Sequence, residues 1–175
     1  MTSPDRTPDI VGFNARLSGC SDADRAALLS AVCASPRWVR DMLAGAPFDD
    51  AEALLTRADQ VLDALPDDEL LVALDGHPRI GARPDNPSSA REQSAVADAD
   101  TELRGRLAAA NRRYEARFGH VYLVAANGRS AEELLTVLHE RLGNDAATER
   151  RVLRTELGKI NRLRLWRLLS EPEIS

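Results

Sequence analysis

Cysteine is scarce in this chain, and the residue types that bind metals are scattered. The 175 residues include two cysteines, Cys20 and Cys33, and three histidines. This composition predicts neither a disulfide scaffold nor a metal site, since no HxxxH or CxxC pair occurs. Cys33 lies in the apolar stretch 31–34 and is expected to be a small core residue. We therefore expect no metal, and a protein of the reducing cytoplasm.

Long hydrophobic runs are missing as well. No apolar stretch approaches the ~20 residues that span a bilayer, and residues 1–9 contain two prolines but no hydrophobic signal core. The last residues match no lipidation or peroxisomal signal. Neither the phosphate-binding pattern GxxxxGK[ST] nor the nucleophile pattern GxSxG is present. These absences favour a cytoplasmic protein that does not contact membranes, with chemistry or binding that uses no cofactor.

Isoleucine, valine and lysine are also few. The chain has 14 Ile and Val residues against 27 Ala and 24 Leu, a mixture that favours helices because β-branched side chains lose more entropy there. Lys159 is the one lysine beside 22 arginines, a bias to which we attach no functional meaning. With 23 basic and 28 acidic residues the net charge is −5, which disfavours nucleic-acid binding.

Hydrophobic spacing predicts an all-α fold: a single compact domain of about eight helices. The first twenty residues read as irregular, and from Ser21 onward capping residues and prolines mark helix starts. Helices are expected to begin near residues 21, 36, 50, 66, 88, 130 and 145. The helix from 88 runs to 117, with Gly105 as its weak point. We expect a flexible N-terminus over 1–9, a helical domain over 10–168 and a C-terminal tail over 169–175.

A rigid loop is expected between two of these helices. Glycine and proline recur within 75–87, at Gly76, Pro78, Gly81, Pro84 and Pro87. Pro78 disfavours a helical conformation at His77, so a stiff backbone presents the imidazole at the end of a helix. Such a group can exchange a proton near neutral pH. The alternative interpretation is a histidine that only caps the preceding helix.

Four further places carry polar groups of interest. Ser89 and Glu92 have the spacing of a capping box and could do no more than start a helix, although a helix start also attracts anions. His120 could line a pocket or fill a gap, whereas His139 reads as a surface residue. Arg164 lies near the inward stripe of the last helix, where its guanidinium could hold a carboxylate, carbonyl or urea.

Together these motifs resemble one family. The ordered set comprises His-Pro-Arg-Ile-Gly at 77–81, Ser-x-x-Glu-Gln at 89–93, Asn-x-x-Tyr-x-x-Arg-Phe-Gly at 111–119, Glu-Arg-Leu-Gly-Asn at 140–144 and Glu-Leu-Gly-Lys-Ile at 156–160. The resemblance covers roughly residues 10–168. It is to the 2-oxo-4-hydroxy-4-carboxy-5-ureidoimidazoline (OHCU) decarboxylases, which deliver (S)-allantoin in urate degradation.

The resemblance implies an all-α homodimer without metal or organic cofactor, acting on a small-molecule substrate, a ureidoimidazoline carboxylate. By position, His77 matches the catalytic proton donor, Glu92 the catalytic glutamate and Arg164 the arginine that completes the site. The substrate-contacting positions are Pro78, Ser89, Ala90, Arg91, Glu92, Gln93, Tyr122, Leu123, Val124, Ala125 and Ala126. Some relatives have Phe-Gly-Phe-Pro-Phe at 118–122, a difference that leaves main-chain contacts of 122–126 unchanged. An association with the upstream 5-hydroxyisourate hydrolase is left open.

Other interpretations remain open at this point. The first is a lyase or hydrolase that acts on another ureido acid in the same pocket. The second is a non-catalytic helical binding module on the same scaffold, against which the presence of His77, Glu92 and Arg164 argues. The third is a helical DNA-binding protein, which the net charge of −5 disfavours. The enzyme interpretation requires that the three side chains meet around one cavity.

Overall fold

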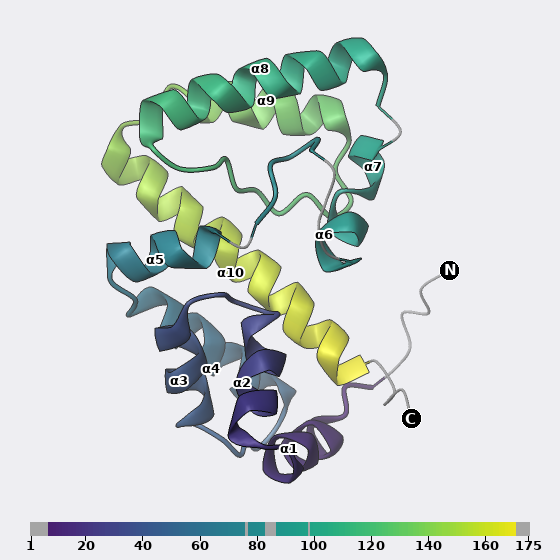
Figure 1. Cartoon of the computed structure of the whole chain (residues 1–175), viewed down its shortest axis with the longest axis vertical. Coiled ribbons are helices and arrows are strands. Elements are labelled where there is room, and N and C mark those ends of the chain that lie inside the picture. Colours follow the sequence, from purple (N-terminus) through teal and green to yellow (C-terminus); the bar gives the residue numbers. More distant parts are fainter. Residues whose placement is uncertain (1–6, 76, 83–86, 98, 171–175) are drawn as a thin grey trace. The chain divides into compact units, whose positions relative to one another are not determined.

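The computed structural model describes residues 7–75, 77–82, 87–97 and 99–170, and within these ranges it contains helices and no strand (Figure 1). The helical segments are α1 (Ile10–Gly19), α2 (Asp22–Ser30), α3 (Pro36–Leu43), α4 (Ala51–Asp63), α5 (Asp67–Leu74), α6 (Pro87–Glu92), α7 (Ser94–Ala97), α8 (Thr101–Phe118), α9 (Ala131–Arg141) and α10 (Ala146–Ser170). The all-α class predicted from the composition is confirmed. No helix in these ranges is long and apolar enough to cross a membrane.

The chain forms two compact units, each of which is described by itself. The first comprises Met1–Leu70 with Gly158–Ser175, and the second comprises Leu71–Leu157. The first unit therefore contains α1 to α4 and the C-terminal part of α10. The second contains α6 to α9 and the N-terminal part of α10.

The core of the first unit is built around α3, which packs against α2 and α4 (Figure 1). Trp38 of α3 is fully buried, and its indole N–H donates to the Ala58 carbonyl at 3.3 Å. Cys33 is also fully buried, which confirms its assignment to the core. The Asn14 side chain bonds both the N–H and the C=O of Phe48, at 3.0 and 2.8 Å, and so fixes the loop before α4.

Helix α1 was not expected, since the first twenty residues were predicted to be irregular. The Asp9 side chain accepts from the Gly12 N–H at 2.8 Å and caps the helix. Phe13 and Leu17, four residues apart, are buried on one helix face. The interpretation was wrong because this helix has only ten residues and depends on a cap and on tertiary packing, neither of which makes a long periodic pattern.

In the second unit α8 packs against α9 and buries most of the core (Figure 1). The buried cluster consists of Ile80, Val96, Leu103, Leu107, Ala110, Tyr114, Tyr122, Val124, Ala126, Ala131, Leu134, Leu135 and Leu138. Between the two helices, residues 119–130 cross the unit without helical structure. Gly119 ends α8 with a φ of 77°, a left-handed conformation that glycine adopts without strain.

Most predicted helix starts are confirmed, because capping is a local effect. Ser21, Asp50, Ser130 and Asp145 each accept a main-chain N–H at the start of a helix, and Ser130 forms the full capping box with Glu133. The single helix expected over 88–117 is wrong. It is divided into α6, α7 and α8, since Asp100 caps a new helix by accepting from the Leu103 N–H at 2.7 Å.

The capping box expected at Ser89 is also wrong, because α6 begins at Pro87 and Ser89 lies inside the helix. Parts of the expected loop over 75–87, at Gly76 and at 83–86, lie outside the described residues, as do residues 1–6 of the expected N-terminus and 171–175 of the expected tail. The rigidity of that loop and the domain limits stay predictions.

Candidate active site

His77 is fixed at the C-terminal end of α5. Its main-chain N–H donates to the Leu74 carbonyl at 2.9 Å, and its ring Nδ1 lies 3.0 Å from the Ala73 carbonyl oxygen. A carbonyl can only accept, so Nδ1 carries the proton, and Nε2 is the nitrogen through which a proton is exchanged. His77 therefore caps the preceding helix, as the alternative interpretation had it. The same contact orients the ring.

Three side chains hold the described part of the loop that follows His77. The Asn111 amide donates to the Ile80 carbonyl at 2.9 Å, and the Gly81 N–H donates to the Gln93 carboxamide oxygen at 3.0 Å. Arg79 forms two bonds with the Glu115 carboxylate, at 2.6 and 2.9 Å, and this partner raises the Arg79 pKa. The contact between Gly81 and Gln93 joins the His77 loop to the end of α6.

Helix α6 and the turn residue Gln93 that follows it place the predicted run 89–93 on two different faces. Ser89, Glu92 and Gln93 are buried, with exposed fractions of 1%, 7% and 7%, as their spacing on one helix face requires. Ala90 and Arg91 lie on the exposed face. Gln93, predicted to contact substrate, also has a role that the sequence did not reveal, since it holds Gly81.

Arg164 lies in the first unit and is 8% exposed, which confirms its position near the inward stripe of α10. Its Nη1 donates to the carbonyls of Ala31 and Val32 at 3.5 and 3.4 Å. His77 and Glu92 belong to the second unit. The meeting of the three side chains around one cavity therefore stays a prediction.

The Cys33 thiol lies among polar groups of the first unit. Burial raises its pKa from 9.0 to about 11, and the polar groups of Ser35 and Asn161 and the charge of Arg164, which lower it, offset this only in part. The thiol is therefore neutral at physiological pH, and the charge of Arg164 is not paired with a thiolate.

The predicted run 122–126 follows α8 as an irregular segment, and four of its five side chains, those of Tyr122, Leu123, Val124 and Ala126, are buried. The Tyr122 hydroxyl donates to the Leu134 carbonyl at 3.2 Å, and burial raises the Tyr122 pKa, so the phenol stays neutral. This side chain serves the core. We therefore expect the main-chain N–H and C=O groups of this segment, rather than its buried side chains, to contact a ligand.

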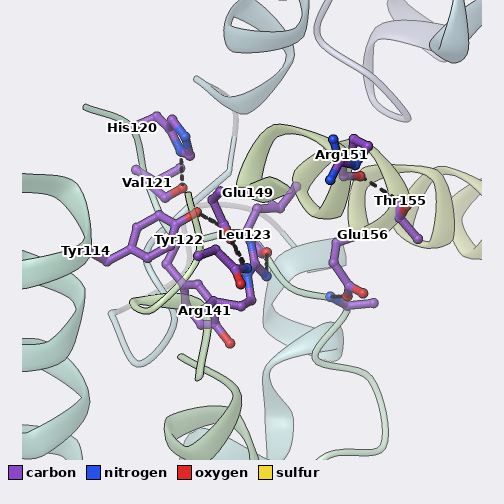
Figure 2. Close-up of polar contacts among 12 residues, drawn as sticks. Tyr114, His120, Val121, Tyr122, Leu123, Arg141, Glu149, Arg151, Thr155 and Glu156 are labelled. Carbon is purple, nitrogen blue, oxygen red and sulfur yellow. Dashed lines mark hydrogen bonds and ion pairs between the residues drawn. The ribbon is translucent and has the colours of Figure 1, made fainter. Parts of the chain in front are cut away.

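Two main-chain groups of this segment are bound by side chains (Figure 2). The Leu123 carbonyl accepts from Arg141 Nη1 at 2.6 Å, and the Ala125 N–H donates to Glu156 Oε2 at 2.8 Å. The N–H and C=O of Val124, between them, make no hydrogen bond to any residue that the structure describes, although Val124 is only 3% exposed. Buried main-chain groups are nearly always satisfied, so this pair marks a place where a ligand or water would bind.

Arg141 is itself held by a buried ion pair with Glu149, and Figure 2 shows both beside Tyr114. Arg141 Nε donates to Glu149 Oε1 at 2.8 Å, Asn144 donates to Glu149 Oε2 at 2.8 Å, and the Tyr114 hydroxyl donates to the same carboxylate. Burial works against the charge of Arg141, but the bond to Glu149 outweighs it and raises the Arg141 pKa. Burial and the bond to Glu149 raise the Tyr114 pKa, so Tyr114 stays a donor.

The remaining histidines are placed as follows. His120 packs its ring on Phe118 and edge-on to Tyr114, with centroid separations of 6.2 and 5.6 Å, and thus fills a gap in an aromatic cluster. His139 is exposed on α9, which confirms the surface interpretation. Among the described residues, no group of three or more His, Cys, Asp or Glu side chains could hold a metal ion.

Comparison with known proteins places this geometry in a family. The family model described as OHCU decarboxylase matches residues 18–166. The chain is 31% identical to the uric acid degradation bifunctional protein TTL of Arabidopsis thaliana over 79% of this chain and 45% of that protein. It is 29% identical to the 2-oxo-4-hydroxy-4-carboxy-5-ureidoimidazoline decarboxylase of Amia calva over 73% of this chain and 77% of that protein. The chain thus spans less than half the length of the Arabidopsis protein.

Two solved structures resemble this chain in fold. The crystal structure of an OHCU decarboxylase in the presence of (S)-allantoin superposes with a TM-score of 0.74 at 26% identity, covering 81% of this chain and 96% of that one. A crystal structure of (S)-allantoin synthase matches with a TM-score of 0.66 at 16% identity, covering 87% of this chain and 52% of that one, and shows likeness of fold alone.

Proposed function

This chain belongs to the OHCU decarboxylase family, and from that premise we propose that it converts 2-oxo-4-hydroxy-4-carboxy-5-ureidoimidazoline to (S)-allantoin and CO₂. The substrate carries its carboxylate and a hydroxyl on one ring carbon, beside a C=N bond. When the bond to the carboxylate breaks, its electron pair moves through the neighbouring carbon onto the imine nitrogen, and CO₂ leaves. The electron sink is part of the substrate, so the protein's task is to bind, orient and deliver a proton.

The oriented imidazole of His77 is the observation that carries this proposal. Because Nδ1 donates to the Ala73 carbonyl at 3.0 Å, Nε2 is the atom that faces the proton transfer. After CO₂ leaves, the hydroxyl loses its proton to become the ring carbonyl, the former imine nitrogen gains one proton, and a second proton must reach the neighbouring carbon from one face to give the (S) centre. A positioned imidazolium suits that step, and general acid catalysis contributes about 10²–10⁴-fold in rate.

Arg164 and Glu92 have supporting roles in the proposal. A salt bridge from Arg164 to the departing carboxylate would stabilise the ground state more than the transition state, so Arg164 engages a ring or ureido oxygen on which negative charge builds up. Glu92 accepts ureido N–H groups or orients His77, since two close anions repel each other. The N–H and C=O of Val124 offer a donor and an acceptor that match an amide or ureido group.

The test is a decarboxylation assay with freshly generated substrate, timed to outrun its spontaneous decay. CO₂ release and optical rotation are followed for the purified chain, for His77→Asn and for His139→Asn. Asparagine places an amide N–H near the position of Nδ1 and preserves the bond to Ala73, but it provides no acid at the position of Nε2. We expect kcat to fall at least 100-fold in His77→Asn at unchanged melting temperature.

His139→Asn makes the same chemical change at an exposed position and is expected to keep wild-type turnover. Full activity in His77→Asn would refute the role of the histidine. If the wild-type chain releases CO₂ no faster than the uncatalysed control, the decarboxylase activity is refuted. The alternatives are then an enzyme that acts on another ureido acid and a non-catalytic binding module.

The homodimer and the cytoplasmic location that the resemblance implies belong to the same proposal, as does an association with the hydrolase that supplies the substrate. Relatives named as bifunctional uric acid degradation proteins support a close connection between successive steps. Sedimentation of the purified chain, alone and mixed with such a hydrolase, measures both interactions.

A further inference from the structure

Two peptide groups on either side of Val124 are held from the protein interior. Arg141 from the end of α9 binds the Leu123 carbonyl at 2.6 Å (Figure 2). Glu156 from α10 binds the Ala125 N–H at 2.8 Å. In a trans peptide unit the C=O of one residue and the N–H of the next point in opposite directions, so the Val124 N–H points away from the Leu123 C=O and the Val124 C=O points away from the Ala125 N–H. Anchoring Leu123 and Ala125 therefore fixes the direction of the Val124 groups.

Both anchors are stiff. Arg141 is 5% exposed and is locked by the Glu149 carboxylate, which is fully buried. Glu156 is 7% exposed and projects from the middle of a helix of 25 residues. Charged groups make shorter and stronger hydrogen bonds than neutral ones, so they fix a main-chain segment that has no helix or sheet bonds of its own.

We propose that Arg141 and Glu156 are positioning residues of the active site: they hold the Leu123 carbonyl and the Ala125 N–H so that the N–H and C=O of Val124 are presented to the amide or ureido part of the substrate. The inference rests on the proposed function. Neither side chain touches the reacting atoms. Their effect is on binding, because contacts to a non-reacting part of the substrate persist from ground state to transition state.

The sharpest test compares two replacements of Glu156. Glutamine retains an oxygen that accepts from the Ala125 N–H, whereas leucine has similar bulk and no acceptor. We expect Glu156→Leu to raise KM, and the Kd for (S)-allantoin measured by calorimetry, about tenfold while kcat stays within threefold. Glu156→Gln restores both constants to within twofold of wild type. A merely structural defect would lower the active fraction, and so apparent kcat, at unchanged KM.

Arg141→Lys and Arg57→Met complete the experiment. Lysine can still bind the Leu123 carbonyl through one ammonium N–H, so Arg141→Lys is expected to raise KM less than Glu156→Leu does. Arg57 also binds a main-chain carbonyl, that of Asp41 at 3.1 Å in the first unit, and Arg57→Met controls for loss of such a bond elsewhere. Its KM should match wild type.

The outcomes separate the two proposals. An active wild-type chain whose KM and allantoin affinity are the same in Glu156→Leu and Glu156→Gln overturns the positioning role and leaves the decarboxylase intact. An equal rise of KM in Arg57→Met overturns it as well. A wild-type chain with neither turnover nor allantoin binding removes the proposed function and this inference with it.

Discussion

Replacing Arg141 with methionine should destabilise the protein by removing the only cation bonded to Glu149 among the described residues. The carboxylate is 0% exposed and would keep the Tyr114 hydroxyl and the Asn144 amide as donors. Breaking a buried ion pair from one side typically costs about 3–5 kcal/mol, because the remaining charge stays desolvated. The total free energy of unfolding of a domain is roughly 5–15 kcal/mol, so the loss of the ion pair would remove a large fraction of it.

The cost converts to a melting temperature that is lower by roughly 10 °C, since about 1 kcal/mol corresponds to about 2–4 °C in a chain of this size. The double variant Arg141→Met with Glu149→Gln removes both charges and leaves one acceptor oxygen at 149, which can still accept from the Tyr114 hydroxyl. We expect it to be at least about 2 kcal/mol more stable than the sum of the two single effects predicts.

Urea denaturation of the four proteins, monitored by circular dichroism at constant pH, gives the double-mutant cycle. Unfolding free energies that simply add would refute the reasoning, because they would mean that Arg141 and Glu149 do not depend on each other. A loss below about 1 kcal/mol in Arg141→Met would also refute it, since that is the cost of an exposed pair.

Three further predictions concern stability and reactivity. Cys20 is exposed and Cys33 buried, so a thiol reagent should modify one cysteine in the native protein and two in denaturant. Because the folded pKa of Cys33, about 11, lies above its ordinary 9.0, its contribution to stability is complete below pH 9 and is lost between pH 9 and 11. The stability advantage of wild type over Cys33→Ala should shrink by about 3 kcal/mol over that interval, and a constant difference would contradict the shift. Gly81→Ala should destabilise by about 1–2 kcal/mol, because φ is 83° there while the nearest side-chain atom leaves room at 3.7 Å. Gly105→Ala, in the open on α8, should instead stabilise by up to about 1 kcal/mol, and urea titrations that gave both changes the same sign would refute the distinction.

The parts of the fold that could be predicted from the sequence depend on neighbours along the chain. Ser130 with Glu133, and Asp50 before α4, are capping signals contained within a few residues. The division of 88–117 was missed because helical periodicity continues across it, although Asp100 carries a capping side chain. Gly105 did not break its helix, since it faces open space and costs only its propensity.

In the candidate site, too, the residues that could be predicted are those marked by their neighbours along the chain. His77 stood out because proline and glycine surround it. Arg141 and Glu156 entered the sequence analysis only as members of motifs that carry the family resemblance, and Glu149 was not singled out. Their burial depends on partners that are brought close only by folding, such as the Ala125 N–H, which lies 31 residues from Glu156. A pair such as Arg141 and Glu149, eight residues apart and on different helices, follows no local rule.

The Val124 groups that lack a partner among the described residues belong to the peptide backbone, which every amino acid carries. Exchanging the valine for another side chain changes how the core packs but leaves the donor and the acceptor in place. Alanine scanning would therefore pass over them. An ester in place of the amide, introduced by chemical synthesis or an expanded genetic code, deletes the donor while keeping the valine side chain, and so exposes the contribution of the donor.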